Sequence, residues 1–301
     1  MKSLTQNPSR RDVLKWTTVA GLAACIRPAR AKWPVDNPKS FLTDIGVCAP
    51  LASADLAAKS GCTYIEEGVR RFLVPEESDD AFGAKLAELR ASKLPVPACN
   101  VFLPGSLKCV GPEAKHEAIL SYSETAFLRA QKAGTTLVVF GSGESRRIPD
   151  GFDRKKAGEQ FMNLCIRMSP LAEKYGVTVA LEHLNRTETN TINSLAEGLE
   201  MVDRVHHPRF QMLADFYHML KEDEKPEIVV TGGKRIVHCH LAEKEKRTPP
   251  GIAGDDFKPY LRALKKIGYR GKLSLECRWD NFDAQLSPAV TALKRQISEV
   301  V

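Results

Sequence analysis

The chain has 301 residues, of which 43% are hydrophobic and 27% are charged, a composition typical of a globular protein with a large apolar core. The net charge of +7 is concentrated in residues 1–31, which contain six Lys or Arg and one Asp, so that the rest of the chain carries only +2. A polyanion-binding surface is therefore not supported, and we expect no nucleic-acid partner.

Residues 1–31 have the layout of an export signal peptide. The basic segment SRRDVLK precedes the apolar stretch WTTVAGLAAC, and Ala29 and Ala31 then form a small-x-small cleavage pattern. The apolar stretch is too short to span a bilayer as a helix. Arg10 and Arg11, in their SRRxxLK context, resemble a twin-arginine signal. This resemblance implies that the Tat export machinery moves the folded protein to the periplasm.

Two products of this export are consistent with the sequence. Cleavage after Ala31 would give a soluble periplasmic protein, which is the outcome that we favour. The run Leu22-Ala23-Ala24-Cys25 resembles a lipobox, so lipidation at Cys25 would instead give a membrane-anchored lipoprotein. In either case we expect residues 32–40 to be a connector, because this segment contains Pro34 and Pro38.

From residue 41 onward, apolar strand-like runs alternate with helical patterns. The predicted strands are Phe41–Cys48, Thr63–Gly68, Pro95–Phe102, Thr136–Gly141, Val177–Asn185, Phe210–Tyr217, Ile236–Ala242 and Lys272–Cys277. The predicted helices are Ser53–Ser60, Asp79–Ser92, Pro112–Ala133, Arg154–Tyr175, Ser194–Val205, Pro226–Thr231, Pro259–Ile267 and Pro288–Val300. Eight such units predict an α/β fold, a (β/α)8 TIM barrel formed as one domain by residues 41–301. No GxGxxG motif follows the first strand, which disfavours a doubly wound sheet.

Four consecutive predicted strands end in a carboxylate or an imidazole. Strand 5 carries Glu182, strand 6 carries Asp215, strand 7 carries His240 and strand 8 carries Glu276. The carboxyl ends of barrel strands form the active site, so these side chains should converge. Buried carboxylates that converge repel each other and tend to be protonated, and a divalent cation removes both problems. The sequence therefore predicts one divalent cation on these four residues, with Mn²⁺, Mg²⁺ or Co²⁺ favoured and Zn²⁺ as a further option.

A second histidine lies on the same strand as His240. His238 precedes it by two residues and therefore points to the same face. We assign His240 to the metal because it is nearer the end of the strand, and His238 to a deeper supporting role. Asp215 or Glu276 alone is equally well explained as a helix cap or a salt-bridge carboxylate, but four unrelated structural residues at the ends of strands 5 to 8 are not expected.

The second half of the chain resembles the xylose isomerase-like TIM barrel superfamily, and within it the ketose 3-epimerase branch of sugar isomerases. The resemblance rests on LEHLNRTETN, DFYHM, HCHLAEKEKRTPPG and LSLE, which occur in this order on strands 5 to 8. It implies that Glu182 and Glu276 are the catalytic acid/base pair as well as metal ligands. It also implies that His218, Glu188 and Arg247 bind substrate, although Arg247 lies one residue further along than the family spacing. Dimers or tetramers are common in this branch, so a homo-oligomer is a further expectation.

The resemblance implies an isomerase that transfers protons next to a carbonyl of a sugar or keto-sugar, through an enediolate. We expect this substrate to be unphosphorylated, because no Lys, Arg or His clamp for a phosphate is evident and phosphosugars are scarce outside the cytoplasm. The metal ion would act as Lewis acid and template for this chemistry. One of Glu66 and Glu67 on strand 2, together with Asn100 on strand 3, is a further candidate for the pocket lining.

Three alternative functions are also compatible with parts of the sequence. A metal-dependent lyase or dehydratase would use the same first step and then eliminate from a 3-keto-glycoside or keto-sugar. Apurinic endonucleases share the barrel but need more histidines on the early strands, whereas His116 is the only histidine between residues 32 and 182 and lies in a predicted helix. A non-catalytic sugar-binding barrel would be expected to lack one of the two glutamates, and both are present.

Overall fold

The structure, a computed structural model, describes residues 41–300. The predicted signal peptide (1–31), Cys25 and the predicted connector (32–40) lie outside the described residues. None of the helices between residues 41 and 300 carries an apolar stretch long enough to cross a membrane.

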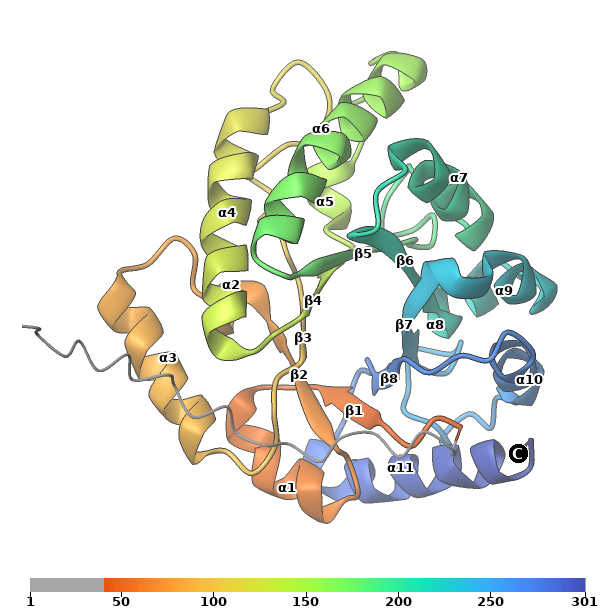
Figure 1. Cartoon of the computed structure of the whole chain (residues 1–301). Coiled ribbons are helices and arrows are strands. Elements are labelled where there is room, and N and C mark those ends of the chain that lie inside the picture. The colour runs from red at the N-terminus through yellow and green to blue at the C-terminus, as the bar shows by residue number, and fades with distance from the viewer. Residues whose placement is uncertain (1–40, 301) are drawn as a thin grey trace, which may run out of the picture. The chain divides into compact units, whose positions relative to one another are not determined.

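Eight parallel strands close into a barrel in which each strand pairs with its neighbours in the chain and β8 pairs with β1 (Figure 1). They are β1 (Ile45–Cys48), β2 (Tyr64–Gly68), β3 (Ala98–Asn100), β4 (Leu137–Phe140), β5 (Thr178–Glu182), β6 (Phe210–Asp215), β7 (Ile236–Leu241) and β8 (Lys272–Leu275). The predicted α/β class and (β/α)8 barrel are confirmed. Every strand is shorter than predicted, because the apolar runs include residues that lead into and out of the barrel.

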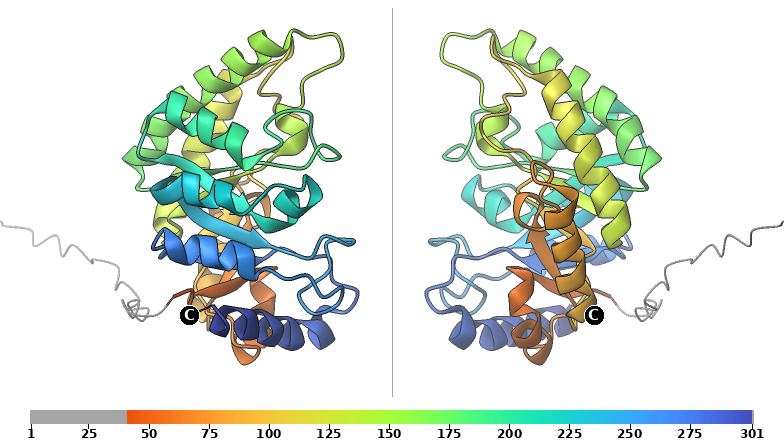
Figure 2. Two further views of the ribbon diagram at one scale, coloured as in Figure 1. Left: turned by 90° about the vertical axis from the view of Figure 1, so that its right-hand side faces the viewer. Right: turned by 90° about the vertical axis from the view of Figure 1, so that its left-hand side faces the viewer.

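Helices surround the barrel (Figures 1 and 2). The longer or expected ones are α1 (Ala54–Lys59), α3 (Asp79–Ala91), α4 (His116–Ala133), α6 (Arg154–Lys174), α7 (Leu195–Val205), α9 (Glu227–Gly232), α10 (Lys258–Lys266) and α11 (Phe282–Ser298). Short helices that the sequence analysis did not predict are α2 (Val69–Phe72), α5 (Gly143–Arg146) and α8 (Phe216–Lys221), and the 3-10 turns are η1 (Leu51–Ser53) and η2 (Gly233–Arg235).

Three of the boundaries that differ from the prediction have a local explanation or bear on the site. The last helix begins at Phe282 rather than at Pro288, because the side chain of Asn281 caps it by accepting from the backbone N–H of Ala284 at 3.1 Å. Pro288 lies within this helix. Helix α4 begins at His116 instead of Pro112, and β6 ends at Asp215 instead of Tyr217 because α8 starts directly after it.

The interior of the barrel is divided into an apolar side and a polar side. Val139 on β4, Ala180 on β5 and Leu213 on β6 form a small apolar cluster of fully buried residues. On the opposite side, Tyr64 and Ser274 are buried and joined by a hydrogen bond of 2.8 Å. Strand side chains alternate, so the next side chain that points inward lies two residues further along each strand. These side chains form the layer at the carboxyl end of the barrel, where the predicted site lies.

The loop after β7 is held by one buried glutamate, Glu243, and extends from the carboxyl end of the barrel (Figure 2). Its Oε1 accepts from the backbone N–H groups of Gly251 at 2.8 Å and Gly254 at 2.9 Å. Its Oε2 accepts from the hydroxyl of Thr248 at 3.0 Å and from the N–H of Ala253. One buried carboxylate that accepts from several donors of the same loop ties them to one point, so Glu243 fixes the course of residues 243–255.

We therefore expect Glu243→Ala to lower the free energy of unfolding by about 3 kcal/mol, since several backbone N–H groups lose a buried charged acceptor at once. The matched control is Glu245→Ala, whose side chain is exposed two residues away and which should change stability by less than about 0.5 kcal/mol. Urea unfolding of both variants provides the measurement. Equal stabilities would show that the loop does not depend on the buried carboxylate.

Candidate active site at the carboxyl end of the barrel

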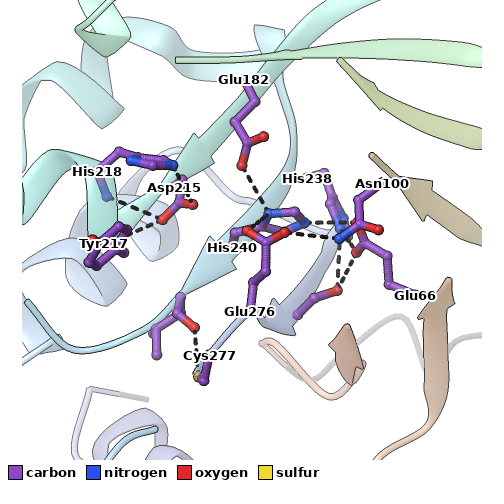
Figure 3. Close-up of polar contacts among 12 residues, drawn as sticks. Glu66, Asn100, Glu182, Asp215, Tyr217, His218, His238, His240, Glu276 and Cys277 are labelled. Carbon is purple, nitrogen blue, oxygen red and sulfur yellow. Dashed lines mark hydrogen bonds and ion pairs between the residues drawn. The ribbon is translucent and has the colours of Figure 1, made fainter. Parts of the chain in front are cut away.

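The four residues predicted to hold a metal converge at the carboxyl ends of β5 to β8 (Figure 3). One ligand atom from each of Glu182, Asp215, His240 and Glu276 lies within 4.8 Å of the ligand atoms of the other three. The first three side chains are almost completely buried, and Glu276 is 21% exposed. Such a cluster of oxygen and imidazole nitrogen donors has the composition of a site for a hard divalent cation.

The end of β4 leaves room for one of these carboxylates. A Cβ atom on Gly141 would lie only 2.2 Å from Oε2 of Glu182. The glycine therefore allows the carboxylate to pass close to the backbone of the neighbouring strand.

His240 presents its two ring nitrogens to different groups. Nδ1 lies 3.1 Å from Oε1 of Glu182 and 3.1 Å from Oε2 of Glu276. Nε2 lies on the other side of the ring, 2.9 Å from Oε1 of Glu66. The nitrogen that faces the cluster is therefore Nδ1.

Asp215 has one oxygen that is used by the fold and one that is not. Its Oδ1 caps α8 by accepting from the N–H of Tyr217 at 2.7 Å and from the N–H of His218 at 3.4 Å. Oδ2 is buried and has no hydrogen-bond partner; Nε2 of His218, which has none either, lies 3.5 Å away, and a guanidinium nitrogen of Arg247 lies 3.6 Å away. A buried carboxylate oxygen without a donor is costly, and a cation among the four residues would satisfy it.

The three residues predicted to bind substrate lie around this cluster. The Nε group of Arg247 donates to the backbone carbonyl of Glu276 at 2.9 Å, and its guanidinium pairs with the carboxylates of Glu276 and Glu188. It also lies over the ring of Tyr217, 4.6 Å from the centroid. His218 is buried, and its Nδ1 accepts from the N–H of Asn185 at 3.1 Å.

The longer spacing before Arg247 does not keep it from the site. Lys246 and Arg247 have φ values of 53° and 59°, in the left-handed region that non-glycine residues seldom adopt. These two residues turn the loop, and the Glu243 contacts described above hold the rest of it. The backbone of these two residues is therefore strained.

Strands β2 and β3 add residues that the sequence analysis named only as candidates. The two adjacent glutamates point in opposite directions: Glu66 contacts His240, whereas Glu67 accepts from the N–H of Leu51 at 2.6 Å and pairs with Arg71. The Nδ2 group of Asn100 donates to Oε1 of Glu276 at 2.9 Å. Glu66 and Asn100 therefore belong to the site, and Glu67 does not.

Two residues near the site were missed. Tyr217 is one of them, and its backbone N–H donates to Oδ1 of Asp215. The other is Cys48, the last residue of β1, whose side chain the alternation of the strand directs toward the barrel interior. The Cys48 sulfur lies within 4.8 Å of ligand atoms of Glu66 and His240. The β1 alternation, with Gly46 two positions earlier, was the available signal for Cys48.

The two glutamates of the cluster have pKa values shifted in opposite directions. Burial and the charge of Glu276 raise the pKa of Glu182 to about 8. Burial acts in the same sense on Glu276, but Arg247 and then His240 lower its pKa to about 2. Burial would lower the pKa of His240, yet Glu66 and Glu276 raise it well above its ordinary value. Without a cation, the cluster therefore holds protons on Glu182 and His240 at neutral pH.

A further cation lies behind the site. The side chain of Arg146 on α5 is fully buried, and none of its three nitrogens has a hydrogen-bond partner. Burial lowers the pKa of Arg146 to about 10, and the charge of Glu182 opposes that shift. Arg146 therefore adds positive charge on the β4 side of the carboxylate cluster.

Comparison with known proteins gives relatives among sugar epimerases. The L-ribulose 3-epimerase of Methylomonas sp. is 35% identical over 111 residues, which cover 36% of this chain and 38% of that protein. The 3-dehydro-D-guloside 4-epimerase of Escherichia coli is 30% identical over 135 residues, which cover 44% of this chain and 49% of that protein. The matched segments thus span less than half the length of these relatives.

A solved structure shows the same fold over almost its whole length. The D-psicose 3-epimerase of Clostridium cellulolyticum H10, solved with D-tagatose, superposes with a TM-score of 0.70 at 20% identity and covers 85% of this chain and 96% of that one. A model of the family described as xylose isomerase-like TIM barrel matches residues 54–298. This match covers most of the chain, which therefore belongs to the xylose isomerase-like TIM barrel family.

Proposed function

We propose that this protein is a divalent-metal-dependent sugar epimerase or isomerase that transfers protons next to the carbonyl of an unphosphorylated sugar or keto-sugar. The observation that carries the proposal is the buried cluster of Glu182, Asp215, His240 and Glu276, in which Oδ2 of Asp215 has no donor. The relatives named as ketose and keto-glycoside epimerases support the same class of reaction.

The four residues of the cluster would hold the cation, with Mn²⁺, Mg²⁺ or Co²⁺ favoured by the three carboxylates and Zn²⁺ also compatible with the donor set. When bound, such an ion supplies Lewis-acid polarisation of a carbonyl and its neighbouring hydroxyl. Everything else in the reaction falls to the side chains of the protein.

Glu182 and Glu276 are the proposed proton-transfer groups. One carboxylate removes the proton from the carbon next to the carbonyl, which gives an enediolate. The other returns a proton from the opposite face, which inverts that carbon or moves the carbonyl. Their pKa values are shifted apart, and such a separation is typical of a catalytic acid and base.

The proposed substrate-binding residues favour hydroxyl groups over phosphate. Arg247 is already paired with Glu276 and Glu188, so its charge is largely compensated. Glu188 and His218 are suited to accept from or donate to sugar hydroxyls. An unphosphorylated sugar is therefore the better match.

A lyase is the second candidate, and the E. coli relative gives the reason. That protein is named for a 3-dehydro-glycoside. Proton removal next to the carbonyl of such a compound can be followed by loss of a leaving group, with the same residues in the same roles. The apurinic-endonuclease alternative is disfavoured, because His116 lies on α4 and bonds to the carbonyl of Cys109 at 2.8 Å.

We also propose export through the twin-arginine route to the periplasm, on the basis of Arg10, Arg11 and the apolar stretch that follows them. Loading of the metal before export would suit a site of oxygen and nitrogen donors, since affinity order alone favours copper and zinc.

The first test follows deuterium uptake and products by NMR when the Mn²⁺-loaded protein is incubated in D₂O with free ketoses and 3-keto-glycosides. We expect exchange at the carbon next to the carbonyl and the appearance of an epimer or isomer. Glu182→Gln and Glu276→Gln should each slow exchange by about 10² to 10⁴-fold. Glu200→Gln, on the exposed face of α7, is the matched control and should exchange at the normal rate.

The reaction products distinguish an epimerase or isomerase from a lyase. Release of the aglycone with an unsaturated keto-sugar would assign the protein to the lyases. Absence of exchange with every sugar, in protein that demonstrably holds metal, would contradict both proton-transfer proposals.

The shifted pKa values predict that metal binding at pH 7 releases at least one proton. Glu182, with a pKa of about 8, and His240 hold protons in the metal-free protein, and the cation must displace them. Affinity should therefore rise as the pH increases toward about 8 and fall below neutrality. Isothermal titration calorimetry in buffers of different ionisation enthalpy counts the protons, and a count of zero would rule out this charge state.

Export can be tested in a host with a functional Tat system. Replacement of both arginines, Arg10→Lys and Arg11→Lys, should leave the protein in the cytoplasm, because the twin-arginine receptor reads the pair. Fractionation with immunodetection provides the measurement. Normal export of the double variant would exclude this route, and a labelled fatty acid on Cys25 would establish the lipoprotein form.

A further inference from the structure

A buried carboxylate on β2 supports the imidazole at the centre of the site. Glu66 is fully buried and has three hydrogen-bond partners (Figure 3). Its Oε1 lies 2.9 Å from Nε2 of His240, and its Oε2 lies 2.7 Å from Nε2 of His238 and 2.6 Å from the hydroxyl of Ser274. The two carboxylate oxygens of Glu66 therefore contact three side chains, two on β7 and one on β8.

The direction of these hydrogen bonds follows from what each group can donate. A carboxylate accepts only, so both imidazole Nε2 atoms and the Ser274 hydroxyl are the donors. The phenol of Tyr64 lies 2.8 Å from the Ser274 oxygen and can donate to it in turn. The chain of donors runs from Tyr64 through Ser274 to Glu66, and all of its members are buried.

This arrangement decides which nitrogen of His240 carries a lone pair. In the metal-free cluster Nδ1, which lies 3.1 Å from both Glu182 and Glu276, can also carry a hydrogen. When a cation displaces that hydrogen, Nε2 keeps its own for Glu66, and the neutral ring presents the lone pair of Nδ1 to the cluster. Three acceptors then meet at one place, as a cation site requires. The opposite tautomer would direct an N–H into the cluster and leave Oε1 of Glu66 without its donor.

We propose that Glu66 is a positioning residue for the metal: it holds His240 in the Nε2–H tautomer so that Nδ1 faces the ion, and His238 and Ser274 hold Glu66 in place. This inference rests on the metal site proposed above. A carboxylate behind a metal-binding histidine raises the basicity of the ligand and fixes its orientation. His238 thus acts through Glu66, below the metal cluster rather than within it.

A rival interpretation uses some of the same atoms. Cys48, Glu66 and His240 each offer one ligand atom within 4.8 Å of the others, so they form a second candidate group for a cation. However, both oxygens of Glu66 are already occupied by donors, and Nε2 of His240 needs its hydrogen for Oε1. A second ion would have to displace that proton and break this contact. The closeness of Cys48, Glu66 and His240 is therefore better explained by Glu66 supporting His240 through a hydrogen bond than by a second metal ion.

The chain provides a matched control in the next residue. Glu67 is also buried, at 2% exposure, and also accepts hydrogen bonds, but from backbone N–H groups and Arg71 outside the barrel. Glu66→Gln and Glu67→Gln each remove one buried, hydrogen-bonded charge. Both variants should lose stability, whereas only the first should disturb the metal.

The experiment measures Mn²⁺ binding to the metal-free protein by calorimetry. Wild type should bind one ion per chain, Glu67→Gln should bind with the same Kd, and Glu66→Gln should bind about 10- to 100-fold more weakly. If Glu66→Gln fails to fold, Ser274→Ala removes one of the three donors and should give a smaller loss in the same direction. An unchanged Kd in the Glu66 or Ser274 variant would overturn the inference while leaving the metal site intact.

A second readout reports the tautomer itself. In ¹⁵N-labelled, Zn²⁺-loaded wild type, His240 should show a protonated Nε2 and a metal-bound Nδ1, and the protonated Nε2 signal should weaken or shift in Glu66→Gln. Binding through Nε2 would overturn the inference. The rival site would be established if the protein bound two ions per chain and if the Co²⁺-loaded protein showed a thiolate-to-cobalt charge-transfer band that Cys48→Ser removes. No metal binding by wild type would overturn both this inference and the proposed metal dependence.

Discussion

The concentration of buried negative charge at one end of the barrel is the constraint on which the rest of the site depends. Three carboxylates of the cluster surround one imidazole, and the carboxylate of Glu66 lies against the other side of the same ring. Burial makes each charge expensive, so each needs a partner or a proton. The protein supplies Arg247 at the open side, Asn100 at Glu276 and the buried cation of Arg146 behind. Oδ2 of Asp215 is still left without a donor, which is where a divalent cation would complete the balance.

The two sides of the barrel interior contribute differently to this balance. On the β4–β6 side, Val139, Ala180 and Leu213 form an apolar floor, and the carboxylate of Glu182 above it has its pKa raised by burial. On the other side, the floor is polar, and Glu66 fixes the ring of His240 through hydrogen bonds. One side therefore favours a carboxyl group that can hold a proton, and the other side favours a fixed imidazole. This division follows from which strands carry polar residues at the inward positions just below the site.

The sequence was sufficient for the fold and for the four central residues because both depend on local rules. Alternation along a strand and the shared direction of parallel strands place Glu182 and its partners at the same end without any knowledge of loops. The choice between Glu66 and Glu67 could not be made in this way. All five residues of β2 are buried, since parallel barrel strands are covered on both faces, so polarity does not indicate which side faces inward. The course of the loop to Arg247 depends on Glu243 and on backbone contacts up to Asp255, which no spacing rule describes.

The geometry of the site is compatible with each of the proposed sugar reactions. Removal of a proton next to a carbonyl needs a base. Completion needs a group that returns a proton to the same carbon in an epimerisation, to the former carbonyl carbon in an isomerisation, or to a leaving oxygen in an elimination. In the proposed reactions Glu182 and Glu276 would supply both functions, because one oxygen of each lies 3.1 Å from Nδ1 of His240. The outcome would then depend on whether the substrate has a leaving group β to the carbanion and on which sugars the loop carrying Arg247 admits. The relatives are named for a ketose and for a 3-dehydro-glycoside, which are substrates without and with a glycosidic group that could leave.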